Sequence, residues 1–168
     1  ILGLLVADGE IKINDLELNH KNLKKIISKI GVVLENPDDQ FVAETVMDDI
    51  AFCLENMNVD KKEIKSRVNK IAKFVGIQDI LEREPHSLSG GQKQLVSLAS
   101  ALVIDPDILI LDEALTMIDL DVREKIYKIL EQVNKINKIT IINITHDMDE
   151  ILYGDNLIIL DNGNIVLN

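Results

Sequence analysis

The chain has 168 residues, of which 46% are hydrophobic and 28% charged, a balance typical of one globular domain with a sizeable core. The net charge is −11, and because an acidic surface repels phosphate backbones, this charge argues against nucleic-acid binding as a general function. Cys53 is the only cysteine, so the chain can form no internal disulfide, which is typical of proteins in a reducing compartment.

The first part of the sequence predicts two short strands. Residues 9–13 alternate like a strand, and Asn14-Asp15 predicts a turn. Residues 30–34 form a short apolar run rich in β-branched side chains, which predicts a buried strand. This strand stops at residues 36–39, Asn-Pro-Asp-Asp, a sequence typical of a loop.

The character of the chain changes at residues 44–85, where we expect a small helical insert. Asp60 suits the N-cap of a helix, with Glu63 at the position of a capping box. Gly76 suits the end of the same helix. The apolar side chains between them recur at helical spacing and predict a core-facing stripe: Ile64, Val68, Ile71 and Val75.

Helices and strands alternate after Pro85. Ser89 suits the N-cap of a helix that runs to about Val103, and residues 108–111 form a fully apolar strand. A second helix is expected from Asp121.

The last part of the chain predicts one more buried strand and a hairpin. Residues 139–144 form the strand, and residues 161–164, Asp-Asn-Gly-Asn, separate the apolar runs 157–160 and 165–167. The alternation predicts an α/β fold with a mainly parallel sheet covered on both faces. Ligands of such sheets bind beyond the carboxyl ends of the strands, which here carry polar residues: Glu35, Asp112, Glu113 and His146.

Ser89-Gly90-Gly91-Gln92 places two glycines at the start of a helix. Glycines let a ligand approach the backbone, and the free N–H groups of a helix N-terminus favour an anion such as phosphate. A serine N-cap after a glycine turn would explain the same letters. With Leu88 before it and Lys93 and Gln94 after it, the segment resembles the signature motif of ABC ATPases.

Residues 108–114, Ile-Leu-Ile-Leu-Asp-Glu-Ala, resemble the Walker B strand of the same family. A carboxylate at a strand end can hold Mg²⁺, and a second one can act as general base on the attacking water. The resemblance therefore assigns the metal to Asp112 and the base to Glu113. Two solvated acids after a buried strand remain the alternative.

Two further segments extend the resemblance. Residues 116–119, Thr-Met-Ile-Asp, are similar to the D-loop, which implies that Asp119 lies at the contact between two ATPase domains. Residues 144–147, Ile-Thr-His-Asp, resemble the switch region, where His146 would donate a hydrogen bond to the γ-phosphate.

Residues 35–41, Glu-Asn-Pro-Asp-Asp-Gln-Phe, resemble the Q-loop of ATPase subunits of energy-coupling-factor transporters and related cobalt and cation uptake systems. Residues 45–52 and 55–56 extend the likeness. Glu35 stands where that family has Gln, so it would contact nucleotide and metal while adding a negative charge beside the phosphates. Leu95 stands where Arg is usual just after the signature, which suggests a lost surface or interface contact.

The sequence contains no G-x-x-x-x-G-K-[ST], the loop that binds the β- and γ-phosphates. Residues 2–5 and 9–11 resemble the segment that follows this loop and its helix in the family. We therefore expect that the chain is truncated upstream of Ile1, and that these residues alone bind ATP weakly and do not hydrolyse it.

The resemblance implies a P-loop NTPase-like fold whose first part is missing, with a core at residues 1–43 and 86–168, a helical subdomain at about 44–85 and a C-terminal β-hairpin. It implies an ATPase that uses ATP and Mg²⁺ to energise uptake of cobalt, another cation or a vitamin. The partners would be a second ABC ATPase subunit, identical or different, and a transmembrane coupling subunit, with the protein peripheral on the cytoplasmic face of the cell membrane.

Other readings of the intact protein stay open. The departures fit the less active member of an asymmetric ATPase pair, a drifting gene, or an ABC-fold subunit that has become inactive or regulatory. A non-transport ABC ATPase for DNA repair or chromosome maintenance is disfavoured, because such proteins carry long coiled coils and basic surfaces.

Overall fold

A computed structural model describes residues 9–116 and 118–167 of the chain, so the likeness noted for residues 2–5 lies outside the described residues. The chain first forms a hairpin of β1 (Lys12–Ile13) and β2 (Leu16–Glu17). Asn14 and Asp15 between them both have positive φ, a conformation that these two residue types tolerate well. The predicted turn is confirmed.

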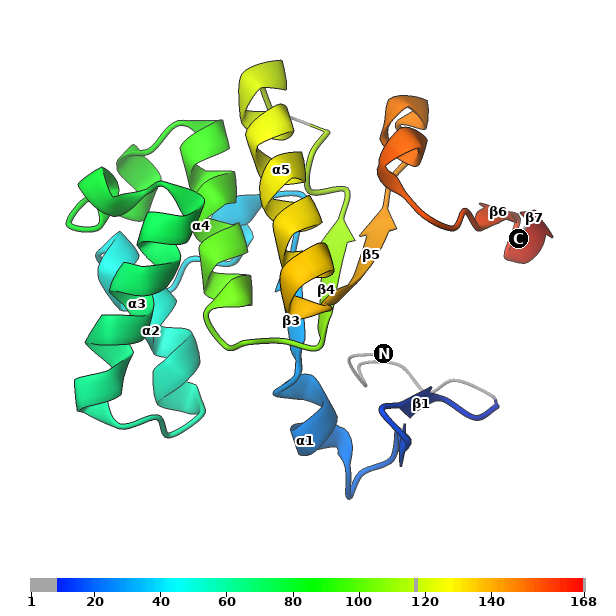
Figure 1. Ribbon diagram of the computed structural model, residues 1–168, viewed down its shortest axis with the longest axis horizontal. Helices are drawn as coiled ribbons and strands as arrows, with labels where there is room; N and C mark the ends of the chain where they lie inside the picture. The colour runs from blue at the N-terminus through cyan, green and yellow to red at the C-terminus, as the bar shows by residue number, and fades with distance from the viewer. Residues whose placement is uncertain (1–8, 117, 168) are drawn as a thin grey trace.

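A parallel sheet of three strands forms the centre of the molecule, in the order β3 (Ile30–Val33), β4 (Ile108–Asp112) and β5 (Thr140–Ile144) (Figure 1). Its register pairs Val33 with Leu111 and Asp112 with Ile144. The carboxyl ends of all three strands therefore meet at one edge, and the predicted parallel sheet is confirmed.

Side chains of the sheet alternate between two faces, as the pleat requires. One face packs beneath α4 (Gly90–Leu102) and α5 (Leu120–Asn137) and contributes Val33, Leu109 and Leu111 to the main core. The other face forms a small second cluster, Ile13, Ile26, Ile30 and Ile110, with the hairpin and α1 (Leu23–Ile27).

The sequence predicts a sheet covered on both faces by other elements. Within the described residues, this covering is incomplete at β5. Ile144 at the end of this strand is 48% exposed, and the strand has no neighbour on its outer side among residues 9–116 and 118–167. The second face is covered mainly at β3 and β4, because the hairpin and α1 are short.

The predicted helical insert contains α2 (Val46–Asn56) and α3 (Lys61–Val75), which lie beside α4 on the side away from β5 (Figure 1). Asp60 caps α3 by accepting a hydrogen bond from the Lys62 N–H, and Gly76 ends it with a φ of 75°. The expected capping box is absent, because Glu63 pairs with Arg67 at 2.7 Å instead. One buried cluster runs through α2, α3, α4 and α5, so the subdomain boundary stays a prediction.

Short 3₁₀ turns connect these elements: Pro37–Asp39, Gln78–Ile80, Pro85–Ser87 and Met148–Tyr153. The chain then forms the predicted C-terminal hairpin, β6 (Ile159–Asp161) and β7 (Asn164–Leu167), whose residues are exposed. Across the part of the chain that the structure describes, none of the helices is both long enough and apolar enough to cross a membrane.

Candidate nucleotide-binding site

The end of β4 turns sharply at Glu113. This residue has a φ of 49°, the left-handed conformation that costs a residue with a side chain about 1 kcal/mol or more. Two hydrogen bonds hold the turn: the Glu113 N–H donates to the Ile144 carbonyl at 2.9 Å, and the Thr116 hydroxyl donates to the Glu113 carbonyl at 2.9 Å. The first bond ties the turn directly to the end of β5.

This turn brings together two residues that the sequence predicts to act together. His146 Nδ1 lies 3.1 Å from Glu113 Oε2, and the two side chains are 73% and 38% exposed. A carboxylate in this position can polarise a water molecule, while an imidazole can donate a hydrogen bond to an anion. Both groups are open to a ligand at the carboxyl edge of the sheet.

An ion pair from α5 holds the loop that carries His146. Arg123 Nη1 donates to Asp147 Oδ2 at 2.8 Å, and Asp147 Oδ1 accepts from the Asp149 N–H at 3.0 Å. The backbone hydrogen bond from Asp149, followed by the contact with Arg123, lowers the pKa of Asp147. Sequence reasoning missed Arg123, since a pairing across 24 residues leaves no local pattern.

The carboxylates assigned to the metal, Asp112 and Glu35, are both exposed: Asp112 is the last residue of β4, and Glu35 lies just beyond the end of β3. Carboxylate oxygens are the donors that Mg²⁺ prefers, so the chemistry of these residues fits the ion. No group of three or more His, Cys, Asp or Glu side chains is arranged to hold a metal within residues 9–116 and 118–167. Phosphate and water oxygens would have to supply most of the ligands, as is usual for Mg²⁺.

Ser89 begins α4 as predicted. Its hydroxyl accepts from the Gln92 N–H at 3.3 Å, and the Ser89 N–H donates to Gln92 Oε1 at 3.1 Å, which together form a capping box. The Gln92 side chain therefore has a structural partner, while its assignment to nucleotide binding stays a prediction.

The two glycines that follow have different surroundings. A Cβ atom at Gly91 would lie 2.9 Å from the Val122 Cγ2 atom of α5, too close for normal packing. A Cβ atom at Gly90 would meet no atom of the described residues within 4 Å. The fold therefore explains the glycine at 91, whereas the glycine at 90 faces open space in which a ligand or a second chain could approach.

Two other positions named by the sequence analysis, Asp119 and Leu95, lie at the start of α5 and within α4. Asp119 occupies the N-cap position of α5 with an exposed side chain, and Met117 of the same D-loop segment lies outside the described residues. Leu95 is buried in the main core, so the expectation of a lost surface contact is wrong, while that of a lost interface contact stays a prediction.

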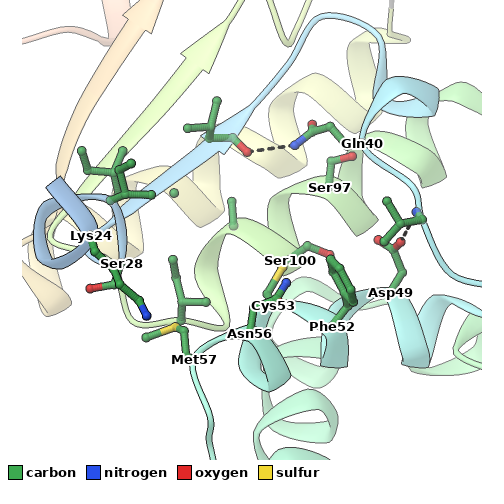
Figure 2. Close-up of a pocket in the computed structure, with 17 residues that line it drawn as sticks. Lys24, Ser28, Gln40, Asp49, Phe52, Cys53, Asn56, Met57, Ser97 and Ser100 are labelled. Atoms are coloured by element: carbon green, nitrogen blue, oxygen red, sulfur yellow. Dashed lines mark hydrogen bonds between the residues drawn. The ribbon is translucent and has the colours of Figure 1, made fainter. Parts of the chain in front are cut away.

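A groove of about 450 Å³ lies between α1, β3, α2 and α4, next to the loop that follows β3. Figure 2 shows Asp49, Phe52 and Ser100 around it, together with the hydrogen bond that Gln40 donates to the Val32 carbonyl at 3.1 Å. Sequence reasoning did not identify the groove, because its lining comes from four separate elements.

Two polar residues of the groove, Asp49 and Ser97, are buried. Asp49 Oδ1 accepts hydrogen bonds from the Val42 and Ala43 N–H groups at 2.8 and 3.3 Å, and burial raises the pKa of this carboxyl. The hydroxyls of Ser97 and Ser100 are buried and find no hydrogen-bond partner in the described part of the chain. Burial, followed by the charge of Asp49, raises the pKa of the Cys53 thiol to about 11.

Comparison with known proteins gives a consistent result. A family model described as "ABC transporter" matches residues 1–116. The chain is 44% identical over 171 residues to the energy-coupling factor transporter ATP-binding protein EcfA1 of Leuconostoc mesenteroides, covering all of this chain and 63% of the relative. It is 46% identical to the protein of the same name from Mycoplasma mycoides, covering 99% of this chain and 41% of the relative. The chain thus spans less than two thirds of the length of these curated relatives.

Solved structures agree with the sequence comparison. The chain superposes on cbiO1 of Clostridium perfringens, part of the ABC transporter complex cbiONQ, with a TM-score of 0.89 and 35% identity, covering 99% of this chain and 68% of that one. It superposes on the ATP-binding cassette MJ0796, a dimer in a post-hydrolysis state with ADP and phosphate, with a TM-score of 0.84 and 26% identity, covering 95% and 72%. The predicted fold and the predicted family are confirmed, and the chain belongs to the ABC transporter family.

Proposed function

We propose that the full-length protein binds and hydrolyses ATP and energises an uptake transporter of the energy-coupling-factor type, for cobalt, another cation or a vitamin. The contact of Glu113 with His146 at the carboxyl edge of the sheet carries this proposal, since it pairs a base with a hydrogen-bond donor. The names of the relatives, ATP-binding proteins of such transporters, support it.

In the proposed reaction, Glu113 polarises the attacking water and His146 donates a hydrogen bond to the γ-phosphate. Asp112 and Glu35 hold Mg²⁺, which supplies charge neutralisation to the phosphates when it is bound. Because the Glu113 carbonyl and N–H are fixed by Thr116 and Ile144, the carboxylate is positioned before the nucleotide arrives.

A second ATPase subunit, identical or different, completes the site. Ser89 and the N–H groups of Gly90 and Gly91 face the nucleotide held by that subunit, and Asp119 lies at the contact between the two. The open space at Gly90 supports this arrangement, because no atom of residues 9–116 and 118–167 would contact a Cβ atom there. The dimeric state of the related cassette MJ0796 also supports it.

A transmembrane coupling subunit docks in the groove between α2 and α4, so that the protein sits at the cytoplasmic face of the membrane. The groove is apolar at Phe52 and Met57 and carries the carboxylate of Asp49. It also touches Gln40, so movement of the loop after β3 would reach the docked subunit directly.

The test is ATP turnover by the full-length protein assembled with its partner subunits. His146→Ala removes a hydrogen bond to the transition state and should lower kcat by about 100-fold or more. His20→Ala is the matched control, because His20 is exposed and follows the β1–β2 hairpin, not a strand of the parallel sheet. Equal turnover in the two variants would contradict the role of His146, and an assembly that binds ATP without turnover would favour an inactive or regulatory subunit.

A further inference from the structure

Asp38, in the loop after β3, contacts α4, the helix that begins at the segment resembling the signature motif. Lys93 Nζ donates to both carboxylate oxygens of Asp38 at 2.7 Å. The Lys93 side chain is only 15% exposed, whereas that of Asp38 is 41% exposed. An ammonium that contacts both carboxylate oxygens, on a lysine whose side chain is mostly covered, holds the carboxylate more firmly than a pair of two fully exposed side chains does.

A second contact joins the same two elements. Gln94, which is buried in α4, donates from Nε2 to the Leu34 carbonyl at 3.0 Å. The Gln40 side chain accepts from the Leu34 N–H at 2.9 Å and donates to the Val32 carbonyl at 3.1 Å. Residues 34–40 are therefore held by β3 on one side and by α4 on the other.

Asp38 also reaches the segment that precedes the signature. His86 Nδ1 lies 3.3 Å from Asp38 Oδ1, although His86 is mostly exposed and contributes little on its own. Asp38 thus contacts residues on both sides of Ser89. The hydrogen bond from Lys93 is the main cause that lowers the pKa of Asp38, so this carboxyl is charged at neutral pH.

We propose that Asp38 is a positioning residue that fixes the orientation of Ser89, Gly90 and Gly91 relative to Glu35. The inference rests on the proposed function, in which Glu35 contacts the nucleotide of its own chain and the glycines contact that of the partner subunit. Through Asp38 and Lys93, displacement of one contact displaces the other. The ion pair therefore couples the two nucleotides of an ATPase pair within a single chain.

This role predicts a specific change in kinetics. Without the ion pair, the start of α4 keeps its capping box but can tilt relative to residues 34–40. ATP binding by the chain's own site is unaffected, whereas the site that the two subunits form together is less well aligned for hydrolysis. We expect kcat to fall while KM for ATP stays nearly constant.

The experiment uses the full-length protein assembled with its partner subunits, with Asp38→Asn and Lys93→Met as variants. Each should lower kcat about 5- to 10-fold, the effect of losing a charge-assisted hydrogen bond of about 1 kcal/mol, with KM within about twofold. Lys93→Arg keeps the positive charge next to Asp38, so this variant should retain most of the wild-type kcat. The double variant should match the single ones, since both changes remove one interaction. Glu131→Gln and Lys135→Met break an exposed pair on α5 and serve as matched controls.

Amide hydrogen exchange separates this inference from the proposed function. In Asp38→Asn, exchange of residues 34–40 and 88–93 should rise together while α5 is unchanged, whether or not the protein hydrolyses ATP. Unchanged exchange in either segment, or a kcat equal to that of the control variants, would overturn the role of Asp38. An inactive wild-type assembly whose Asp38→Asn exchange rises as expected would contradict only the proposed function.

Discussion

Substitution of the two signature glycines by alanine should separate a packing role from a functional one. At Gly91 the new Cβ would lie 2.9, 3.2 and 3.3 Å from Cγ2, Cγ1 and Cβ of Val122. Overpacking of this kind costs about 1–3 kcal/mol, and the better helix propensity of alanine returns up to about 1 kcal/mol. Gly91→Ala should therefore lower the free energy of unfolding by about 1 kcal/mol.

Gly90→Ala should behave differently, because no atom in the part of the chain that the structure describes lies within 4 Å of its Cβ position. The free energy of unfolding should be unchanged or higher by about 0.5 kcal/mol, since alanine has less backbone entropy to lose. Urea unfolding of the full-length protein, followed by circular dichroism, measures both variants. ATP turnover should fall in both, so that Gly90→Ala is a folded protein with a defective site.

Val122→Ala provides the control for the packing argument. It removes the methyl groups that Gly91→Ala would meet, so the double variant should be more stable than the sum of the two single changes predicts, by about 1 kcal/mol. The reasoning would be refuted if Gly90→Ala destabilised the protein more than Gly91→Ala, or if the two changes at 91 and 122 were additive.

Other predictions concern single residues. Ser89→Ala removes the N-cap of α4 and should cost about 1 kcal/mol in urea unfolding. Glu35→Gln removes a carboxylate that the proposed function places beside the phosphates, so it should raise ATP affinity in a binding titration; an unchanged affinity would argue against a role for Glu35 there. The pKa of Asp147 is lowered in the folded protein, so its contribution to stability is present above about pH 4 and is lost as the pH falls further. Asp147→Asn should consequently reduce the loss of stability below that pH, and a Tm profile from pH 7 to pH 2 measures this. Cys53, with a pKa of about 11, should react slowly with iodoacetamide at pH 8 and rapidly once urea unfolds the chain.

The sequence was sufficient for features that depend on neighbouring residues. Three such features have local causes. An apolar run forms the strand that ends at Asp112, and a hydroxyl before a helix makes Ser89 an N-cap. A residue without a side chain, Gly76, adopts the left-handed conformation that ends α3. The meeting of Glu113 with His146 followed from parallel topology, since strands of one direction end at one edge.

Features that depend on distant side chains could not be predicted in this way. The pairing of Asp38 with Lys93 spans 55 residues, and the groove at Asp49 needs four elements to be placed before it exists. The burial of Leu95 could not be predicted either, because a comparison with the usual arginine does not say which face of α4 the side chain occupies.

The central claim is that Glu113 is the base of an ATPase, and the most direct measurement is a single-turnover experiment on the full-length protein assembled with its partner subunits. In Glu113→Gln, bound ATP should remain intact at least about 100-fold longer than in the wild type, with ATP affinity unchanged, because only the activation of water is lost. If Glu113→Gln hydrolyses its bound ATP at the wild-type rate, Glu113 is not the base and the proposed reaction is wrong.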